Sequence, residues 1–263
     1  MRQKLKLYQV DAFTDKLFHG NPAGICILNT WPEVSVMQNI ASENNLPETA
    51  FLVQKKDEVE IRWFTPTVEV DLCGHATLAS AHVLFTYYPT QENPIHFFSP
   101  RSGFLEVERN KEWLTLNFPK DTYTKITVPD ILVNAFQMSP IEAYRGKSDF
   151  LLIYDKQQTI EEMNPDMDMI QSVGGRGVII SAPGNEVDFV SRFFAPQSGI
   201  NEDPVTGSAH TTLTPYWSHK TGKNKLTALQ LSKRRGELVC ELKGQRVLIS
   251  GKALTYMVGE IEI

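Results

Sequence analysis

Two short stretches of the sequence join polar side chains to the expected start of a helix. The first reads D-L-C-G-H-A over residues 71–76, and the second reads D-P-V-T-G-S-A over residues 203–209. In both, a glycine lets the chain turn sharply before a run of small residues with good helix formers. The free N–H groups and the dipole of a helix start favour an anion. The two stretches therefore predict sites for a carboxylate or a developing enolate.

Glu48 is the acid whose setting best suits proton transfer. It follows the stiff turn Leu46-Pro47 and precedes the apolar residues 50–51. Partial burial in such a setting suits a carboxyl group that must take up a proton and return it. The alternative is an ordinary loop acid that only accepts a hydrogen bond from a backbone turn.

Further polar groups stand at the two expected helix starts. The dipole disfavours protonation of His75, so a neutral imidazole there could hydrogen-bond a substrate or relay a proton. The alternative for His75 is a simple helix-capping role. Asp203 either caps the second helix, or binds a substrate amine or hydroxyl, or orients His75. Ser208 is placed to donate a hydrogen bond to a substrate carboxylate.

Cys73 raises the possibility of a thiol mechanism, because a helix start favours a thiolate. A racemase with two thiol bases would need a second cysteine at the other helix start, and residues 203–206 contain none. We therefore expect Cys73 to be a packed residue. The segment 174–177, G-G-R-G, lacks the Lys and Ser/Thr of a phosphate loop, and predicts a turn before a strand.

The two stretches belong to an internal repeat. Residues 62–66 (R-W-F-T-P) resemble residues 192–196 (R-F-F-A-P), and the glycines Gly74 and Gly207 match at a constant offset that continues into the following strands. The repeat predicts an α+β fold of two pseudo-symmetric lobes, each a mainly antiparallel, curled β-sheet wrapped around a central α-helix. We expect both helix starts to face one cleft between the lobes. Glu48 has no acidic counterpart in the second lobe.

The predicted lobes cover residues 1–118 and 119–263, and the last strand is free to cross back to the first lobe. The boundary is the polar, turn-rich segment 119–129. The pattern of apolar residues predicts helices over 35–42, 130–138, 140–144 and 166–173, in addition to the two central helices. It also predicts a loop over 14–24 before a short strand over 25–28.

Composition excludes several classes of function. The chain of 263 residues carries a net charge of -5, so nothing favours nucleic-acid binding. No stretch approaches the roughly 20 apolar residues that span a bilayer, and the start does not read as a secretion signal. The 3 cysteines lack metal-ligand spacing, so we expect neither a metal nor disulfides. A reduced cytoplasm is the expected location.

Several motifs together resemble a known family. They are Asp11–Thr14 (D-A-F-T), Gly20–Gly24 (G-N-P-A-G), Asn45–Phe51 (N-L-P-E-T-A-F), Asp71–Thr77 (D-L-C-G-H-A-T) and Glu202–Ala209 (E-D-P-V-T-G-S-A). The whole chain resembles the PhzF-like proteins of phenazine biosynthesis, which share the diaminopimelate epimerase fold. The resemblance implies that Glu48 is the acid/base of an isomerisation, with His75 and Asp203 also catalytic. It implies substrate binding by Asn21, Gly74, Gly207 and Ser208, no metal or cofactor, and usually a homodimer.

The leading hypothesis is a cofactor-independent isomerase in a biosynthetic process, acting on a small carboxylated metabolite. One alternative is a racemase, epimerase or dehydratase on the same scaffold, in which Cys73 assists Glu48. The other is a non-enzymatic interaction or ligand-binding protein that has kept the fold. The motifs do not imply the substrate, since Pro47 stands where relatives also carry a serine.

Overall fold

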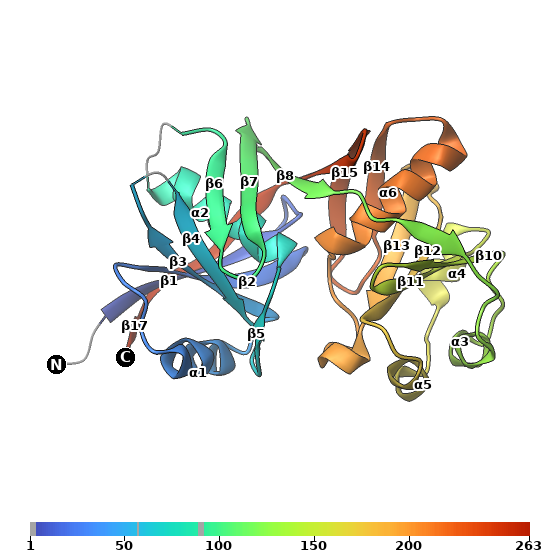
Figure 1. The fold of residues 1–263 in the computed structure, drawn as a ribbon, viewed down its shortest axis with the longest axis horizontal. Coiled ribbons are helices and arrows are strands. Elements are labelled where there is room, and N and C mark those ends of the chain that lie inside the picture. The colour runs from blue at the N-terminus through green and yellow to red at the C-terminus, as the bar shows by residue number, and fades with distance from the viewer. Residues whose placement is uncertain (1–3, 57, 89–91) are drawn as a thin grey trace. The chain divides into compact units, whose positions relative to one another are not determined.

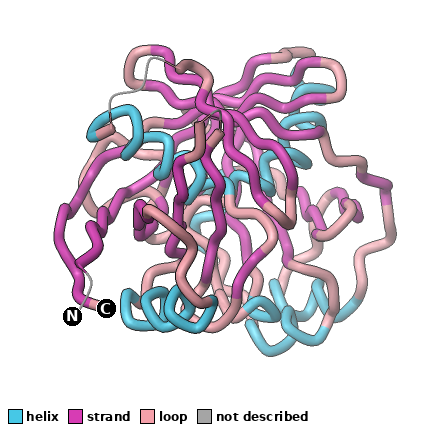
Figure 2. Tube along the Cα trace, turned by 60° about the vertical axis from the view of Figure 1, so that its left-hand side comes forward, coloured by secondary structure: helices cyan, strands magenta, loops and turns pink. Residues whose placement is uncertain are grey.

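The computed structural model describes residues 4–56, 58–88 and 92–263, and the chain divides into two compact units (Figure 1). Unit 1 comprises Met1–Asn117 and Ser250–Ile263, and unit 2 comprises Phe118–Ile249. The sequence predicts a boundary after Phe118 and a last strand that is free to return to the first lobe; in the structure that strand belongs to unit 1. Strands, drawn in magenta in Figure 2, form most of the regular structure.

Unit 1 is a curled sheet with two helices. Its strands are β1 (Lys4–Ala12), β2 (Asn21–Leu28), β3 (Glu48–Gln54), β4 (Val59–Phe64), β5 (Glu69–Val70), β6 (Ile95–Ser99), β7 (Gly103–Asn110), the first part of β8 (Trp113–Pro119) and β17 (Ala253–Glu262). Its helices are α1 (Val34–Asn44) and α2 (Gly74–Tyr87). Most pairs are antiparallel, but β2 runs parallel to β3 and β4 runs parallel to β6.

The helix α2 is enclosed by the strands of unit 1, as the small residues of its sequence predict. Every side chain from His75 to Ala81 is buried, and the helix contacts β1, β2, β3 and β17. The hydroxyls of Thr77 and Ser80 donate to the carbonyls of Cys73 and Ala76 at 2.6 and 2.7 Å, so these polar groups are satisfied inside the helix. A polar group buried in this core therefore costs free energy of folding unless it has a hydrogen-bond partner.

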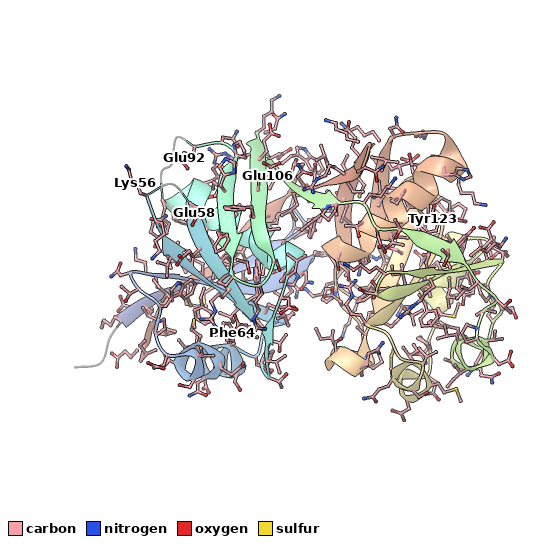
Figure 3. All side chains as sticks on the ribbon, viewed as in Figure 1. Lys56, Glu58, Phe64, Glu92, Glu106 and Tyr123 are labelled. Atoms are coloured by element: carbon pink, nitrogen blue, oxygen red, sulfur yellow. The ribbon has the colours of Figure 1, made fainter. Side chains whose placement is uncertain are left out.

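The strands β2 and β3 are buried along almost their whole length, which is typical of parallel strands covered on both faces. The helix α1 packs against β3 and β4 through Met37, Phe51 and Phe64, the last of which is labelled in Figure 3. Because both strands are fixed by packing, the residues at their first positions are held rigidly.

Unit 2 repeats the arrangement around α6 (Gly207–Thr221), whose residues from Thr212 to Ser218 are all buried. Its other helices are α3 (Asp130–Phe136), α4 (Gln157–Glu162), α5 (Met167–Ser172) and the 3-10 helix η1 (Pro196–Ser198). Its strands are β9 (Tyr123–Lys125), β10 (Glu142–Gly146), β11 (Asp149–Ile153), β12 (Gly177–Pro183), β13 (Phe189–Phe194), β14 (Lys225–Gln230), β15 (Gly236–Lys243) and most of β16 (Arg246–Gly251). The strand β11 runs parallel to β12, as β2 does to β3.

Two predicted elements differ from the structure. The prediction of a helix over 140–144 is wrong, because this segment enters β10, which pairs with β9 and β11. There Tyr144 packs edge-on against Tyr123 and Tyr216, which is tertiary packing that local sequence does not reveal. The predicted loop over 14–24 ends early, because Asn21 already pairs with Ala12 and begins β2.

Within residues 4–56, 58–88 and 92–263, no helix has the length and hydropathy that crossing a bilayer requires.

Candidate active site

The starts of three elements of unit 1 bring its polar residues together. Asn21 begins β2, and the parallel register pairs Ala23 with Glu48, the first residue of β3. The helix α2 begins next to them, with Cys73 as its N-cap. The turn before Asn21 requires Gly20, which has φ +66, and a Cβ there would lie 2.2 Å from the carbonyl oxygen of Ala12.

His75 lies between Glu48 and Asn21. Its Nε2 is 3.2 Å from Oε2 of Glu48, and its Nδ1 is 3.1 Å from the amide nitrogen of Asn21. With the amide nitrogen of Asn21 as donor, Nδ1 accepts, and Nε2 carries the hydrogen of the neutral ring. The side chains of His75 and Glu48 are only 5% and 12% exposed. The contact is therefore a close and nearly buried approach of a carboxylate to an imidazole.

Burial lowers the pKa of His75 to about 3, and a hydrogen bond with the backbone of Pro22 opposes this only in part. The imidazole is therefore neutral at neutral pH, and the contact with Glu48 is not an ion pair. The helix dipole predicts a neutral imidazole at this position, and in the structure the largest cause of the lowered pKa is desolvation by burial.

The thiol of Cys73 lies against the imidazole ring of His75. Its Sγ is 3.5 Å from Nδ1 and 4.0 Å from Nε2 of His75. The side chain is buried, as predicted. The thiol nevertheless borders the same imidazole as Glu48, so its chemical environment is that of the site.

In unit 2, a network of side chains fixes the loop that leads into α6. The carboxylate of Asp203 accepts a hydrogen bond from the hydroxyl of Thr206, the N-cap of α6. Gln230 bridges the loop, because its amide nitrogen donates to the carbonyl of Asp203 and its oxygen accepts from the backbone of Thr206, both at 2.8 Å. Asp203 therefore acts on the helix start through Thr206 and is not itself the cap.

Arg176 is a residue of this region that the sequence analysis missed. Its Nη1 donates to Oγ of Ser208 at 2.7 Å, and its Nε donates to Oδ1 of Asp149 at 2.9 Å, with a second bond from Nη2 to the other oxygen. Burial alone would lower the pKa of Arg176, but the bond and charge of Asp149 outweigh it and the pKa is raised. A charged guanidinium thus lies beside the first turn of α6.

The predicted turn at Gly174 and Gly175 is confirmed, since both have positive φ and β12 follows. From the sequence this segment is predicted only as a turn, with no chemical role for Arg176. The proximity of Arg176 to Ser208 depends on tertiary contacts between segments far apart in the chain, for which the residues carry no local signal.

The predicted residues thus form two sets, each built inside its own unit. Asn21, Glu48, Gly74 and His75 meet in unit 1, where Gly74 is the first residue of α2. Asp203, Gly207 and Ser208 lie at the start of α6 in unit 2. The prediction that both sets face one cleft stays a prediction.

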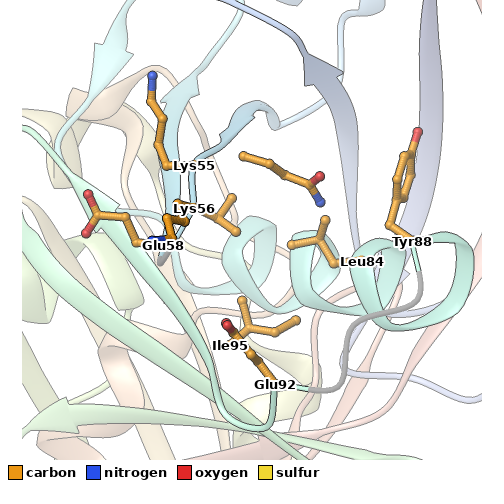
Figure 4. A pocket seen from close by; sticks show the side chains of 9 residues that line it. Lys55, Lys56, Glu58, Leu84, Tyr88, Glu92 and Ile95 are labelled. Carbon is orange, nitrogen blue, oxygen red and sulfur yellow. The ribbon is translucent and has the colours of Figure 1, made fainter.

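A cavity of about 390 Å³ lies elsewhere in unit 1. Figure 4 shows Leu84 and Tyr88 at the C-terminal end of α2 facing it, beside Lys55 and Ile95. The start of α2 is about 15 Å from Leu84 along the helix axis, at 1.5 Å per residue. This cavity is therefore not part of the Glu48–His75 site.

Comparison with solved structures shows that this fold resembles the fold of an epimerase. A hydroxyproline epimerase from Agrobacterium vitis superimposes with a TM-score of 0.64 at 9% sequence identity, covering 100% of this chain and 94% of that one. At this identity the likeness shows the fold alone. Together with the neighbours described next, it confirms the predicted α+β, epimerase-like fold.

The chain belongs to the PhzC-PhzF family, described as phenazine biosynthesis-like protein, whose model matches residues 10–259. An uncharacterized isomerase of Pseudomonas aeruginosa is 45% identical over 260 residues, covering 99% of this chain and 100% of the relative. The crystal structure of a phenazine biosynthesis protein of the PhzF family from Enterococcus faecalis has a TM-score of 0.96 at 44% identity, covering 99% and 100% of the two chains. The family resemblance is confirmed, and the named relatives support an isomerase class.

Proposed function

We propose that the protein is an isomerase that moves a proton within a small carboxylated substrate, with Glu48 as the general acid/base. The observation that supports this most directly is the 3.2 Å contact between Oε2 of Glu48 and Nε2 of the neutral His75. A carboxyl group within hydrogen-bond distance of a neutral imidazole can gain and lose a proton while the imidazole keeps its own protonation state.

In the proposed reaction, the carboxylate of Glu48 removes a proton from a carbon next to an unsaturated group. The electrons of the broken C–H bond enter the neighbouring double bond, and an enolate-like charge develops. The neutral imidazole of His75 and the N-terminal end of α2 stabilise that charge. Glu48 then returns the proton to a different carbon, and the product is an isomer of the substrate. The reaction moves one proton and no net electrons, so it requires no redox cofactor.

For substrate binding, we propose that Gly207 and Ser208 hold a carboxylate at the start of α6. The guanidinium of Arg176 donates to Oγ of Ser208 at 2.7 Å, so the hydroxyl hydrogen of Ser208 can point toward a ligand. Asp203 would bind an amine or hydroxyl of the substrate. A cytoplasmic location and a homodimer stay predictions.

A second candidate is a racemase or epimerase in which two groups act on one carbon. The observation that favours it is the 3.5 Å separation between Sγ of Cys73 and Nδ1 of His75. Burial raises the pKa of both Cys26 and Cys240 to about 12, so an alkylating reagent should select Cys73 if that thiol is reactive. Full activity of Cys73→Ala, together with alkylation that spares activity, would rule the thiol out.

The proposal is tested by proton exchange in D2O, followed by NMR on a panel of small carboxylates that includes trans-4-hydroxy-L-proline. Exchange reports proton removal even when no net product forms. We expect Glu48→Gln to slow exchange by about 10²–10⁴-fold, the usual contribution of a general acid/base. The matched control is Glu108→Gln, an exposed acid on β7, which should exchange like the unmodified protein. Equal exchange rates in Glu48→Gln and its control would remove Glu48 from the mechanism.

A further inference from the structure

Three side chains of unit 1 bring together three different kinds of metal ligand. One ligand atom each from Glu48, Cys73 and His75 lies within 4.8 Å of the others. Oε2 of Glu48 is 3.2 Å from Nε2 of His75, and Sγ of Cys73 is 4.0 Å from the same nitrogen. The set was not apparent from spacing in the sequence, because Glu48 is far from the other two residues.

These separations are close to those that a tetrahedral ion imposes. Zinc binds nitrogen and oxygen at about 2.0–2.2 Å and sulfur at about 2.3 Å, so neighbouring ligands of one ion lie roughly 3.2–3.7 Å apart. The Glu48–His75 distance already fits, and the Cys73 thiol has to approach Nε2 of His75 by a few tenths of an ångström. Its separation from the Glu48 carboxylate, which is within 4.8 Å, has to shorten as well. A rotation of one side chain is sufficient for such a movement.

We propose that Glu48, Cys73 and His75 form a zinc-binding site, and that Zn²⁺ bound there inhibits the protein. The inhibitory part rests on the proposed function, because the ion would occupy the carboxylate and imidazole that transfer the proton.

The chemistry of the three ligands selects zinc over the common alkaline-earth ions. Thiolate and imidazole suit zinc, whereas magnesium and calcium require oxygen ligands. One carboxylate and one thiolate also balance the two positive charges of the ion. Cys73 is the N-cap of α2, where the positive end of the helix dipole favours negatively charged ligands. Three protein ligands leave a fourth position for water or for an anion.

A second shell for the imidazole is already present. A histidine that binds a metal through one nitrogen normally has a hydrogen-bond partner on the other. The amide of Asn21 lies 3.1 Å from Nδ1 of His75, on the side away from Glu48. A rotated Asn21 amide can accept a hydrogen bond from Nδ1–H when Nε2 binds the ion. The imidazole would then stay in place when zinc lies between Nε2 of His75 and the carboxylate of Glu48.

Unit 2 provides an internal contrast. Its helix start carries Thr206 and Ser208 at the positions equivalent to Cys73 and His75. No group of three potential ligands was found there or anywhere else among the described residues. The ligand set is therefore a property of the start of α2, and not of the repeated backbone.

The site can be tested on the full chain without any substrate. Zn²⁺ is titrated by calorimetry into protein freed of metal with a chelator, and Co²⁺ is used as a spectroscopic probe of thiolate ligation. We expect one ion per chain and a sulfur-to-cobalt charge-transfer band. Cys73→Ser should abolish the band and weaken Zn²⁺ binding by more than about 10-fold, because even second-shell changes cost about 10–100-fold. Cys26 and Cys240 remain in this variant, so the loss reports Cys73 alone.

His75→Gln should weaken binding similarly, and its matched control His96→Gln, an exposed histidine on β6, should not. If Cys73→Ser does not fold, as judged by circular dichroism, Glu48→Gln replaces it and should also weaken binding. Absence of Zn²⁺ binding to the unmodified protein, or equal binding by it and these variants, overturns the site.

The zinc site and the proposed function can fail separately. Zinc that binds through Cys73 but leaves proton exchange unchanged, in a protein whose exchange depends on Glu48, overturns the inhibition. Zinc binding through Cys73 in a protein whose exchange is insensitive to Glu48→Gln leaves the site intact and removes the proposed function.

Discussion

The starts of α2 and α6 share a backbone plan but differ in charge. In each unit, two parallel strands supply the polar neighbours of the helix start: β2 and β3 carry Asn21 and Glu48, while β11 and the turn before β12 carry Asp149 and Arg176. His75 of α2 and Ser208 of α6 occupy equivalent positions. The start of α2 thus combines a neutral imidazole with a carboxyl group, and the start of α6 combines a hydroxyl with a guanidinium of fixed charge.

This difference suggests how a duplicated fold acquires one asymmetric site. The residue that differs most in chemistry lies at the start of the second strand in unit 1, as the acid Glu48, and just before the second strand in unit 2, as the guanidinium of Arg176. Proton transfer requires a group that can change its charge, and Glu48 with the neutral His75 is suited to that. Holding an anion requires a group whose charge does not change, and arginine fulfils this. Four predictions test the contrast, from the largest expected effect to the smallest.

The first prediction concerns stability. Arg176→Gln leaves Asp149, which is 4% exposed, without its guanidinium partner. Removal of one member of a buried ion pair costs about 3–5 kcal/mol, and we expect about 3 kcal/mol because Arg176 is partly exposed. Urea-induced unfolding measures the loss. The control is Arg235→Gln, whose exposed contact with Glu161 should contribute less than about 1 kcal/mol. Equal losses in the two variants would show that Arg176 contributes no more to the free energy of unfolding than an exposed arginine does.

The second prediction concerns the neutral imidazole. His75→Gln keeps a hydrogen-bonding group near Glu48 but removes the ring, so we expect proton exchange to slow by about 10²-fold, as for loss of one donor to a developing anion. The measurement is the D2O exchange assay, with His96→Gln as control. An exchange rate equal to that of the control would mean that His75 only supports the fold.

The third prediction uses His210, a buried histidine of α6. Burial lowers its pKa to about 4, although the backbone of Thr206 opposes this. The unfolded chain takes up the proton near pH 6.5 and the folded chain only near pH 4, so stability present above pH 6.5 is lost as the pH falls. The loss due to this residue should be about 1.4 kcal/mol at pH 5.5. Urea unfolding at pH 7.5 and 5.5 should show a smaller pH dependence in His210→Gln; identical pH dependence would contradict the prediction.

The fourth and smallest effect concerns Ser208. Ser208→Ala removes one hydrogen-bond donor to the proposed carboxylate, and we expect KM or Kd for a small carboxylate to rise about 10-fold. Ser172→Ala, at the exposed end of α5, is the control and should leave binding unchanged. A variant of Ser208 that binds as tightly as the control would place the carboxylate elsewhere.

Much of the fold can be predicted from the sequence because the two halves of the chain repeat the same pattern. The repeat at Gly74 and Gly207 and the small residues behind each glycine predicted two enclosed helices, and both are present. Short segments were harder, because a few residues carry too little periodicity to distinguish a strand from a helix. Residues 140–144 were assigned wrongly for this reason, since the aromatic packing of Tyr144 decides their conformation.

The candidate site was predictable where residues lie in one motif and less so where the contact is tertiary. Gly74, His75, Gly207 and Ser208 follow from the helix starts. The closeness of Glu48 to His75 depends on the register of β2 with β3, which the sequence does not specify. From the sequence, Arg176 is predictable only as part of a glycine turn, because its partner Asp149 lies on another strand. The proximity of Cys73 to His75 is a short-range contact, and it was set aside because cysteines are usually packing residues.

The return of β17 to unit 1 has a consequence for the order of folding during synthesis. The strand β1 pairs with β2 on one side and with β17 on the other. Unit 2, Phe118–Ile249, is continuous in the chain, so all its residues are made before those of β17. Domains generally fold as units during synthesis. We therefore expect the unit that carries Ser208 to fold first, and the unit that carries Glu48 and His75 to complete its sheet only after residues 253–262 have been made.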